Sequence, residues 1–327
     1  MNEINQLCQY QDPKKHTCPN EASESGYCYW HDASLDKSGE EVKEKLQDYA
    51  SSGGFLRGIC LKRANLQSID LVKHRSKTGY DFSYADFYRV NLKNAHLFNI
   101  NLTHASLMKA DLTHANLNCG NLKKVNLLGV KWKDCKIENI QIGKSLKQEF
   151  QARKATRKGD IETARDYFEQ AEEVYRDLRK HTEHAGIFRL SGGLIQKELT
   201  MRRMQLPKVS IKRCTSKFVD LFCGYGEAPL RIIGISILII LVCAVLYTFT
   251  GLNYQGTILA YSSVQSTEQN FGFFLSCIYY SVVTFTTLGY GDFTPVGLSR
   301  AIAAFEAFTG SFTLALFVVV FVKKMTR

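Results

Sequence analysis

Four residues near the start of the chain could together bind a metal ion. Cys28 and His31 have the short spacing that lets a single turn supply two ligands, and Cys8 and Cys18 would join them from a separate loop. Thiolates and an imidazole form a tetrahedral set that suits Zn²⁺, and a metal can replace the apolar core that so short a segment lacks. We predict a structural zinc site at these four positions, with His16 as a rival ligand. The alternative is three ordinary thiols beside a surface histidine.

A second group of residues, Thr287-Leu288-Gly289-Tyr290-Gly291, lies between two apolar runs near the other end of the chain. It follows the apolar and aromatic stretch 271–285, which is too short to cross a membrane alone and would form a re-entrant half-helix. A Gly-Tyr-Gly triplet is not specific by itself, because residues 224–226 contain another one. The half-helix before the motif and the apolar runs on both sides make its context specific.

These apolar runs are long enough to cross a membrane, which takes about 20 residues for a hydrocarbon layer about 30 Å thick. Residues 232–249 contain no charge, and Pro229 can begin a helix just before them. Residues 301–322 contain one acid, Glu306, and precede a basic C-terminus. Because basic residues flank both runs on one side, we predict that both ends of the chain are cytoplasmic and that the polar stretch 253–270 is an external loop.

This combination resembles the two-span prokaryotic potassium channels over about residues 217–327. The resemblance implies that residues 287–291 form a K⁺ selectivity filter, whose backbone carbonyls replace the hydration shell of the ion. Leu288 stands in place of the commoner valine, a change that leaves the carbonyls intact. One chain supplies one filter strand, so the resemblance implies a homotetramer. No Arg-rich helix precedes the pore, and we therefore expect no voltage-sensor domain.

The resemblance also implies a role for each filter residue. Gly289 and Gly291 tolerate the positive φ that inward-pointing carbonyls require, at little steric cost. The Thr287 hydroxyl would complete the innermost ion site. Tyr290 would point away from the axis and pack against the half-helix, holding the ring at its diameter.

Residues next to the filter would support it. Tyr279 and Tyr280 are candidates for packing around Tyr290, and their alternative is a position among interfacial aromatics that face lipid. Asp292 directly follows the filter and belongs to the same supporting set.

Two residues of the second span could act on the filter or on the gate. A carboxylate buried in a membrane needs a partner or a proton. The resemblance to some prokaryotic inward-rectifier-like channels implies that Glu306 faces the back of the half-helix, where Thr284 and Thr286 are the available hydroxyls. The competing interpretation places Glu306 on the cavity wall. By resemblance, Gly310 matches a gating hinge, and the alternative is a small residue for close helix contact.

The middle of the chain has a repeat of five residues. Every fifth residue from Phe82 to Ile142 is apolar, and the residue two positions before each is mostly small or β-branched. An earlier tract, Leu56 to Leu71, keeps the same period, and the polar loop 72–79 separates the two tracts. A period of five fits neither a helix nor a pleated strand, and it indicates a coil with a corner at each repeat.

Segments such as Ala-Asp-Leu at 110–112 and Ala-Asn-Leu at 115–117 resemble the pentapeptide-repeat family. The resemblance implies a right-handed quadrilateral β-helix with four pentapeptides to a turn. Some members look like DNA mimics, which requires an acidic rod. Here residues 53–143 contain 14 Lys and Arg against 6 Asp and Glu, so we expect a scaffold and no nucleic-acid partner.

Two further segments connect the rod to the spans. Residues 144–206 are predicted to be helical, with breaks at Gly159-Asp160 and at Gly192-Gly193, in the manner of a tetratricopeptide-like hairpin. Residues 202–217 are basic, and Phe218, Leu221 and Phe222 follow on one helical face. This second segment is predicted to lie on the anionic inner leaflet of the bilayer.

Charge is unevenly distributed along the 327 residues. Residues 1–213 carry 36 Lys and Arg with 26 Asp and Glu, whereas residues 214–327 carry 6 and 5. The charge-poor last third excludes a simply soluble protein. The polar start of the chain lacks the apolar core of a secretory signal, so we expect the N-terminal part to stay in the cytoplasm and the ten cysteines to be reduced thiols or metal ligands.

The sequence therefore predicts a K⁺-selective channel of the cell inner (plasma) membrane that is not an enzyme and is gated or assembled through its pentapeptide domain. The alternatives are a weakly selective cation channel, and a membrane-anchored pentapeptide scaffold that binds protein or DNA. The predicted parts are a zinc-binding segment (1–50), the β-helix (53–143), a helical connector (144–206), a basic interfacial segment (207–228) and the pore module (229–327).

Overall fold

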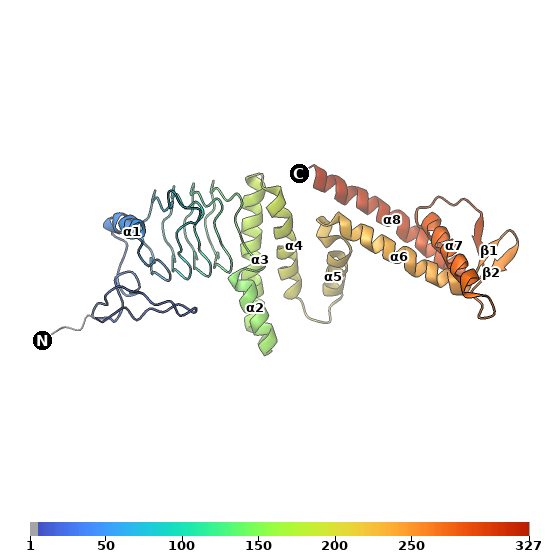
Figure 1. Cartoon of the computed structure of the whole chain (residues 1–327), viewed down its shortest axis with the longest axis horizontal. Helices are drawn as coiled ribbons and strands as arrows, with labels where there is room; N and C mark the ends of the chain where they lie inside the picture. Colours follow the sequence, from blue (N-terminus) through green and yellow to red (C-terminus); the bar gives the residue numbers. More distant parts are fainter. Residues whose placement is uncertain (1–5, 327) are drawn as a thin grey trace. The chain divides into compact units, whose positions relative to one another are not determined.

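The structure is a computed structural model that describes residues 6–326 (Figure 1). It divides into two compact units, one ending at Ser210 and the other beginning at Ile211. Each unit contains buried apolar residues of its own. The finer division of the chain into five parts stays a prediction.

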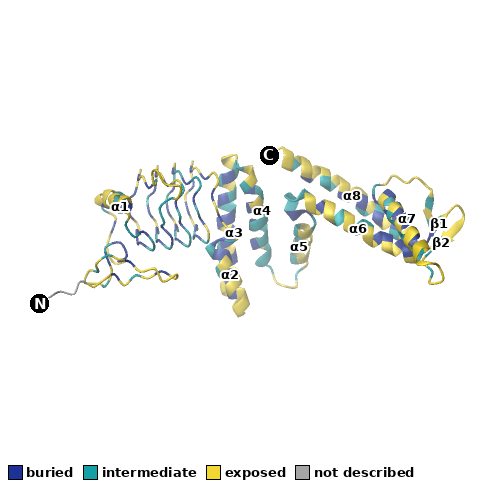
Figure 2. Cartoon of the chain, viewed as in Figure 1, coloured by how far each residue is buried: buried dark blue, intermediate teal, exposed yellow. Residues whose placement is uncertain are grey.

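The repeat region of the first unit is a coil in which one turn takes 20 residues. Short parallel bridges join Asp81 to Asn101, Asn101 to Asn121, and Asn121 to Gln141. One turn thus contains four repeats of five residues. The large residue of every repeat from Phe82 on is buried, and so is the residue two positions before it, except for the half-buried Tyr80 (Figure 2). The predicted pair of inward-facing residues is confirmed.

The first turn of the coil is longer than the others. Its bridges join residues 26 apart, such as Cys60 and Asp86, which is six residues more than the 20 of later turns. The extra residues form the polar loop 72–79 that the sequence predicted. Before this turn lies helix α1 (Glu41–Ser51), whose Val42, Leu46 and Ala50 are buried in the same core as the coil's leucines.

Three helices follow the coil: α2 (Lys147–Lys158), α3 (Ile161–His184) and α4 (Phe188–Met204). The predicted break at Gly159-Asp160 is confirmed, and the Asp160 side chain accepts a hydrogen bond from the amide of Thr163. The predicted break at Gly192-Gly193 is wrong, because α4 continues through both glycines. The turn occurs instead at Gly186, whose φ of 71° is left-handed.

Packing explains why α4 continues through its glycines. Leu194 and Met201 are buried in the shared core, and the buried Glu198 binds Arg179 of α3, with Nε 2.7 Å from the carboxylate. These tertiary contacts outweigh the lower helix propensity of two glycines, which is about 1 kcal/mol each.

The second unit contains four helices and a small sheet. The helices are α5 (Ile211–Cys223), α6 (Pro229–Thr250), α7 (Thr267–Phe285) and α8 (Ser299–Met325), with the short 3₁₀ helix η1 (Gly224–Gly226) after α5. In the described residues, α6 and α8 are long and apolar enough to cross a membrane, and much of their surface is exposed in the single chain (Figure 2). Pro229 occupies the first turn of α6, as predicted.

The stretch 253–270 is more ordered than a polar loop. Strand β1 (Leu252–Tyr254) pairs antiparallel with β2 (Thr257–Leu259) and also with β3 (Phe293–Pro295), which follows the filter motif. Helix α7 begins at Thr267, before the predicted start at 271. Ser266 and Gln269 form a capping box that extends the helix by a polar first turn.

Candidate ion-conducting site and metal centre

The filter motif forms a loop between the C-terminal end of α7 and strand β3. Its φ angles are positive at every second residue: 57° at Thr287, 59° at Gly289 and 78° at Gly291. Leu288 and Tyr290 between them are not in this region. An alternation of backbone handedness lets successive carbonyls point to one side, which is the geometry that a ring of carbonyl ligands needs. A positive φ was predicted at the two glycines but not at Thr287, because a positive φ is uncommon for a threonine.

The filter loop is hydrogen-bonded to the last turn of α7. The amide of Thr287 donates to the carbonyl of Thr284 at 3.0 Å, and the amide of Leu288 donates to the carbonyl of Val283 at 3.0 Å. At the other end, the Asp292 carboxylate accepts from the amide of Phe293 at 3.0 Å. Both ends of the loop are therefore fixed to regular elements.

The middle of the loop is exposed in the single chain. Leu288 is 59% exposed and Tyr290 is 67% exposed. A Cβ built on Gly289 or Gly291 meets no atom within 4 Å. In the single chain the middle of the loop is therefore open to its surroundings on most sides.

The two tyrosines predicted to pack around Tyr290 lie in different surroundings. Tyr280 is buried and packs edge-on against Tyr247 of α6, with ring centroids 4.9 Å apart. Tyr279 is 41% exposed and lies near Phe293 of β3, with centroids 6.3 Å apart. The structure therefore brings Tyr280 to the neighbouring helix and Tyr279 to the sheet.

Glu306 is fully buried and joins three helices. Its carboxylate accepts a hydrogen bond from Tyr247 Oη of α6 at 2.7 Å and another from the hydroxyl of Ser281 of α7. Ser281 Oγ also lies 2.9 Å from the carbonyl of Ile240, which brings α7 against α6 at the same place.

The predicted hydroxyl partners of Glu306, Thr284 and Thr286, are wrong. Ser281 lies one turn before Thr284 on the same side of α7, and the hydroxyl of Thr286 donates to the carbonyl of Val282 in its own helix at 2.7 Å. The position of α8 along the axis of α7 determines which turn of α7 faces the carboxylate. That position cannot be predicted from a local sequence pattern.

Gly310 is buried against the end of α7. A Cβ at this position would lie 2.0 Å from the carbonyl oxygen of Phe285, the last residue of α7. The observation favours the close-packing alternative for this glycine. Gly310 lies inside an unbroken α8, one turn after Glu306.

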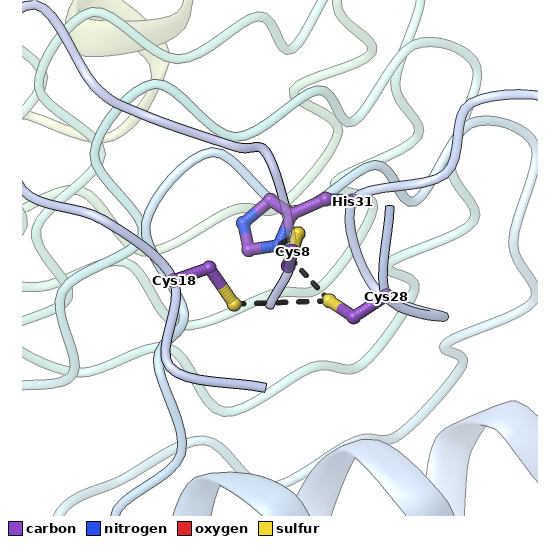
Figure 3. Close-up of side chains that lie close together, drawn as sticks. All are labelled: Cys8, Cys18, Cys28 and His31. Carbon is purple, nitrogen blue, oxygen red and sulfur yellow. Dashed lines mark hydrogen bonds between the residues drawn. The ribbon is translucent and has the colours of Figure 1, made fainter. Parts of the chain in front are cut away.

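The predicted metal ligands converge in the first unit (Figure 3). Cys8, Cys18, Cys28 and His31 are all buried, and their ligand atoms lie within 4.8 Å of one another. Cys18 Sγ and Cys28 Sγ are 3.8 Å apart, too far for a disulfide, whose S–S bond is about 2.05 Å. A tetrahedral Zn²⁺ with Zn–S bonds of about 2.3 Å gives an S···S edge of about 3.8 Å. The spacing thus fits a metal set.

His31 is oriented to offer one nitrogen to this set. Its Nδ1 lies 3.1 Å from Cys28 Sγ and 3.7 Å from Cys8 Sγ. Its Nε2 lies 2.8 Å from the carbonyl oxygen of Arg57. A carbonyl only accepts, so Nε2 carries the proton and the Nδ1 lone pair is free to bind a metal.

The rival ligand His16 lies outside the cluster. Its Nδ1 lies 3.0 Å from the carboxylate of Asp12, and its side chain is 51% exposed. Burial opposes ionisation of Asp12, but hydrogen bonds from His16 and Lys14 and the nearby Arg57 hold the pKa of Asp12 at about 2.

Burial, followed by the neighbouring Cys28 and Cys8 thiols, raises the pKa of Cys18 to about 12. Metal binding at neutral pH would therefore release a proton from Cys18.

Comparison of the sequence with known protein families gives one match in each unit. Residues 234–327 match the family described as ion channel, and residues 91–129 match pentapeptide repeats in eight copies. The first unit thus carries pentapeptide repeats, and the second unit carries a region of the ion channel family. With its two membrane-length helices, the chain is a membrane protein of the ion-transport class.

Similar solved structures are pentapeptide-repeat proteins. One from Nostoc Pcc 7120 is 31% identical, covers 29% of this chain and 74% of its own, and has a TM-score of 0.25. Rfr23 from the cyanobacterium Cyanothece 51142 is 22% identical, covers 27% of this chain and 84% of its own, and has a TM-score of 0.18. No curated protein matches the chain.

Proposed function

We propose that this protein is a K⁺-selective channel in which four copies of the chain close a ring of filter strands, Thr287 to Gly291. The observation that carries the proposal is the alternation of positive φ at Thr287, Gly289 and Gly291 in a loop between two membrane-length helices. K⁺ loses its water only where several oxygens replace it at once, and four such loops supply rings of carbonyls.

The other parts of the second unit take roles around this ring. Helix α7 acts as the pore helix, and the Thr287 hydroxyl completes the innermost site. Tyr290, exposed in one chain, packs against neighbouring chains together with Tyr279, and Asp292 anchors the outer end of the loop. Conduction is passive and needs neither a voltage sensor nor catalysis.

The cytoplasmic assembly consists of the first unit. The coil is a right-handed quadrilateral β-helix, and it gates or assembles the channel through the helical connector. Both termini face the cytoplasm of the inner (plasma) membrane. Helix α5, with exposed Ile211, Phe218 and Leu221 beside Lys212 and Lys217, lies on the anionic inner leaflet.

Reversal potentials of the purified protein in liposomes test the filter. We expect strong selectivity for K⁺ over Na⁺, and we expect Gly289→Ala to abolish selectivity or conduction while the tetramer persists. The added methyl opposes the positive φ, a strain of about 1–2 kcal/mol in each of four subunits. Gly256→Ala is the matched control, because Gly256 also has a left-handed φ, 86°, with no neighbour within 4 Å.

The same recordings decide between the alternatives. Equal permeability of K⁺ and Na⁺ in the wild type indicates a weakly selective cation channel, and no ion flux at all indicates a membrane-anchored scaffold. Unchanged K⁺ selectivity in Gly289→Ala would contradict the assignment of these carbonyls as ion ligands.

We also propose that Cys8, Cys18, Cys28 and His31 hold one structural Zn²⁺ per chain. The proposal rests on four buried ligand atoms within 4.8 Å of one another and on the orientation of His31. Elemental analysis should find one zinc per chain, lost in Cys28→Ser and retained in His16→Ala and Cys119→Ser. Protein that contains no zinc when purified without chelators would refute it.

A further inference from the structure

Gly310 makes a contact that no other residue type permits. A Cβ there would lie 2.0 Å from the carbonyl oxygen, 2.8 Å from the carbonyl carbon and 3.0 Å from the Cα of Phe285. Cβ atoms essentially never approach a neighbour within 3.0 Å, and a backbone carbonyl cannot swing aside as a long side chain can. Helix α8 therefore touches the main chain of α7 directly at this point.

The contacted residue stands immediately before the filter loop. Phe285 is the last residue of α7 and is 2% exposed, and the filter begins two residues later at Thr287. The amides of Thr287 and Leu288 are held by carbonyls of the same last turn. A displacement of Phe285 consequently moves the innermost residue of the filter, because the backbone between them has little freedom.

A second attachment fixes the rotation of α8 about its axis. One turn before Gly310, Glu306 accepts hydrogen bonds from Ser281 of α7 and Tyr247 of α6. One turn after it, Thr313 is fully buried, and its hydroxyl donates to the carbonyl of Thr309 at 2.7 Å. The same face of α8 is therefore buried over successive turns, and it meets α7 at Glu306 and at Gly310.

We infer that Gly310 is a positioning residue for the filter, through which the place of the inner helix α8 sets the conformation of Thr287 and the residues after it. The inference rests on the proposed K⁺ channel and differs from a hinge. A hinge glycine acts by letting α8 bend, and its replacement changes opening alone. A glycine that permits a close contact acts through Phe285, and its replacement changes the selectivity of the channel for K⁺ over Na⁺.

The experiment compares Gly310→Ala with Gly234→Ala in the full-length channel. Both replace a glycine within a membrane-length helix, so both raise helix propensity by a similar amount. Gly234 has no atom within 4 Å of its Cβ position, whereas Gly310 has the carbonyl of Phe285. Reversal potentials under K⁺ and Na⁺ gradients and single-channel open probability are measured for the wild type and both variants.

We expect Gly310→Ala to lower the permeability ratio of K⁺ to Na⁺ by at least about ten-fold, which corresponds to about 1.4 kcal/mol, and Gly234→Ala to leave it unchanged. Reduced open probability with a wild-type permeability ratio in Gly310→Ala would overturn the inference and support the hinge. A wild type without K⁺ selectivity would instead refute the proposed function, so the two failures are distinguishable.

If Gly310→Ala does not assemble, the inference is tested by a measurement on the wild type. Amide hydrogen exchange is compared in K⁺ and in Na⁺, because an ion that binds the proposed filter should protect the loop at Thr287. We expect the ion to change exchange in α8 around Gly310 as well as in the filter loop, and to leave α6 around Gly234 unchanged. A change confined to the filter loop would overturn the inference.

Discussion

Among single residues, Glu306 is a buried acid that is held by side chains from two neighbouring helices. The carboxylate is fully buried between α6 and α7, where Tyr247 and Ser281 donate to it. A buried polar group is tolerated when its hydrogen bonds are made, and breaking one such bond to a carboxylate costs about 1.5–3 kcal/mol. This position supports a structural role over a place on the cavity wall.

We therefore predict that Glu306→Gln keeps block by internal Mg²⁺ or polyamine nearly unchanged and alters open probability or the thermal stability of the tetramer. The amide keeps the size of the side chain but replaces one acceptor oxygen with a donor. Dose–response curves of block and melting curves of the tetramer measure the two effects. Tyr247→Phe, which removes one donor and no charge, should reproduce the stability effect. A strong fall in block in Glu306→Gln would place the carboxylate in the ion pathway.

At the scale of elements, the metal-ligand segment is joined to the first turn of the coil. The amide of Cys60 donates to the carbonyl of Trp30 at 2.8 Å. In the same way the amide of Asp86, which is the bridge partner of Cys60 in the next turn, donates to the carbonyl of Ile59 at 2.9 Å. Trp30 lies between the ligands Cys28 and His31. The metal-ligand segment thus occupies the place that a preceding turn of the coil would take. It covers part of the exposed β edge of the first turn.

Gly58 allows this docking to be separated from metal binding. The Tyr10 ring stacks on His31 with centroids 4.1 Å apart, and a Cβ at Gly58, where φ is 69°, would lie 1.8 Å from Tyr10 Oη. We predict that Gly58→Ala keeps one zinc per chain but speeds amide exchange at Cys60 by about ten-fold, equivalent to about 1.4 kcal/mol. Hydrogen exchange and elemental analysis on the same sample measure both quantities.

Gly53→Ala is the control for this substitution. Gly53 has a similar φ of 84° but no atom within 4 Å of its Cβ position, so it carries the backbone strain without the contact. Slow exchange at Cys60 in Gly58→Ala would show that the ligand segment does not hold the first turn.

For the whole molecule, the proposed function depends on assembly. Leu288 and Tyr290 are more than half exposed in one chain, and in the proposed tetramer the ring of carbonyls would form only when four chains meet. An ion that binds only the closed ring stabilises the assembly by mass action, by about 2.7 kcal/mol at a concentration 100 times its dissociation constant.

We accordingly predict that the protein is a tetramer whose thermal dissociation occurs at a higher temperature in K⁺ than in Na⁺ at equal ionic strength. Light scattering gives the stoichiometry, and electrophoresis of heated samples gives the dissociation temperature. Gly289→Ala should remove the difference between the two ions while the control Gly256→Ala retains it. A stable dimer, or identical temperatures in both salts, would count against a ring of carbonyl ligands.

Features that depend on local chemistry and on a repeated spacing could be predicted from the residues alone. The five-residue repeat placed large and small residues inside a coil, and the extra residues of the first turn fell in the polar loop 72–79. Two apolar runs, one without charge and one with the single acid Glu306, predicted the membrane-length helices. Residue type and the short spacing of Cys28 and His31 predicted the cluster that the structure brings together with Cys8 and Cys18, and left His16 as a rival. In each case the determining interaction is made by residues close in sequence or by a repeated pattern.

Features that depend on how helices and loops pack against one another could not be predicted in this way. The partners of Glu306 are Ser281 and Tyr247 because the depth and rotation of α8 bring that turn of α7 to the carboxylate. The continuation of α4 through two glycines depends on contacts with α3, and the tautomer of His31 depends on the carbonyl of Arg57. The approach of Gly310 to Phe285 is likewise a distance between two backbones. Packing geometry sets such distances, and it involves residues far apart in the chain whose relative placement no local pattern encodes.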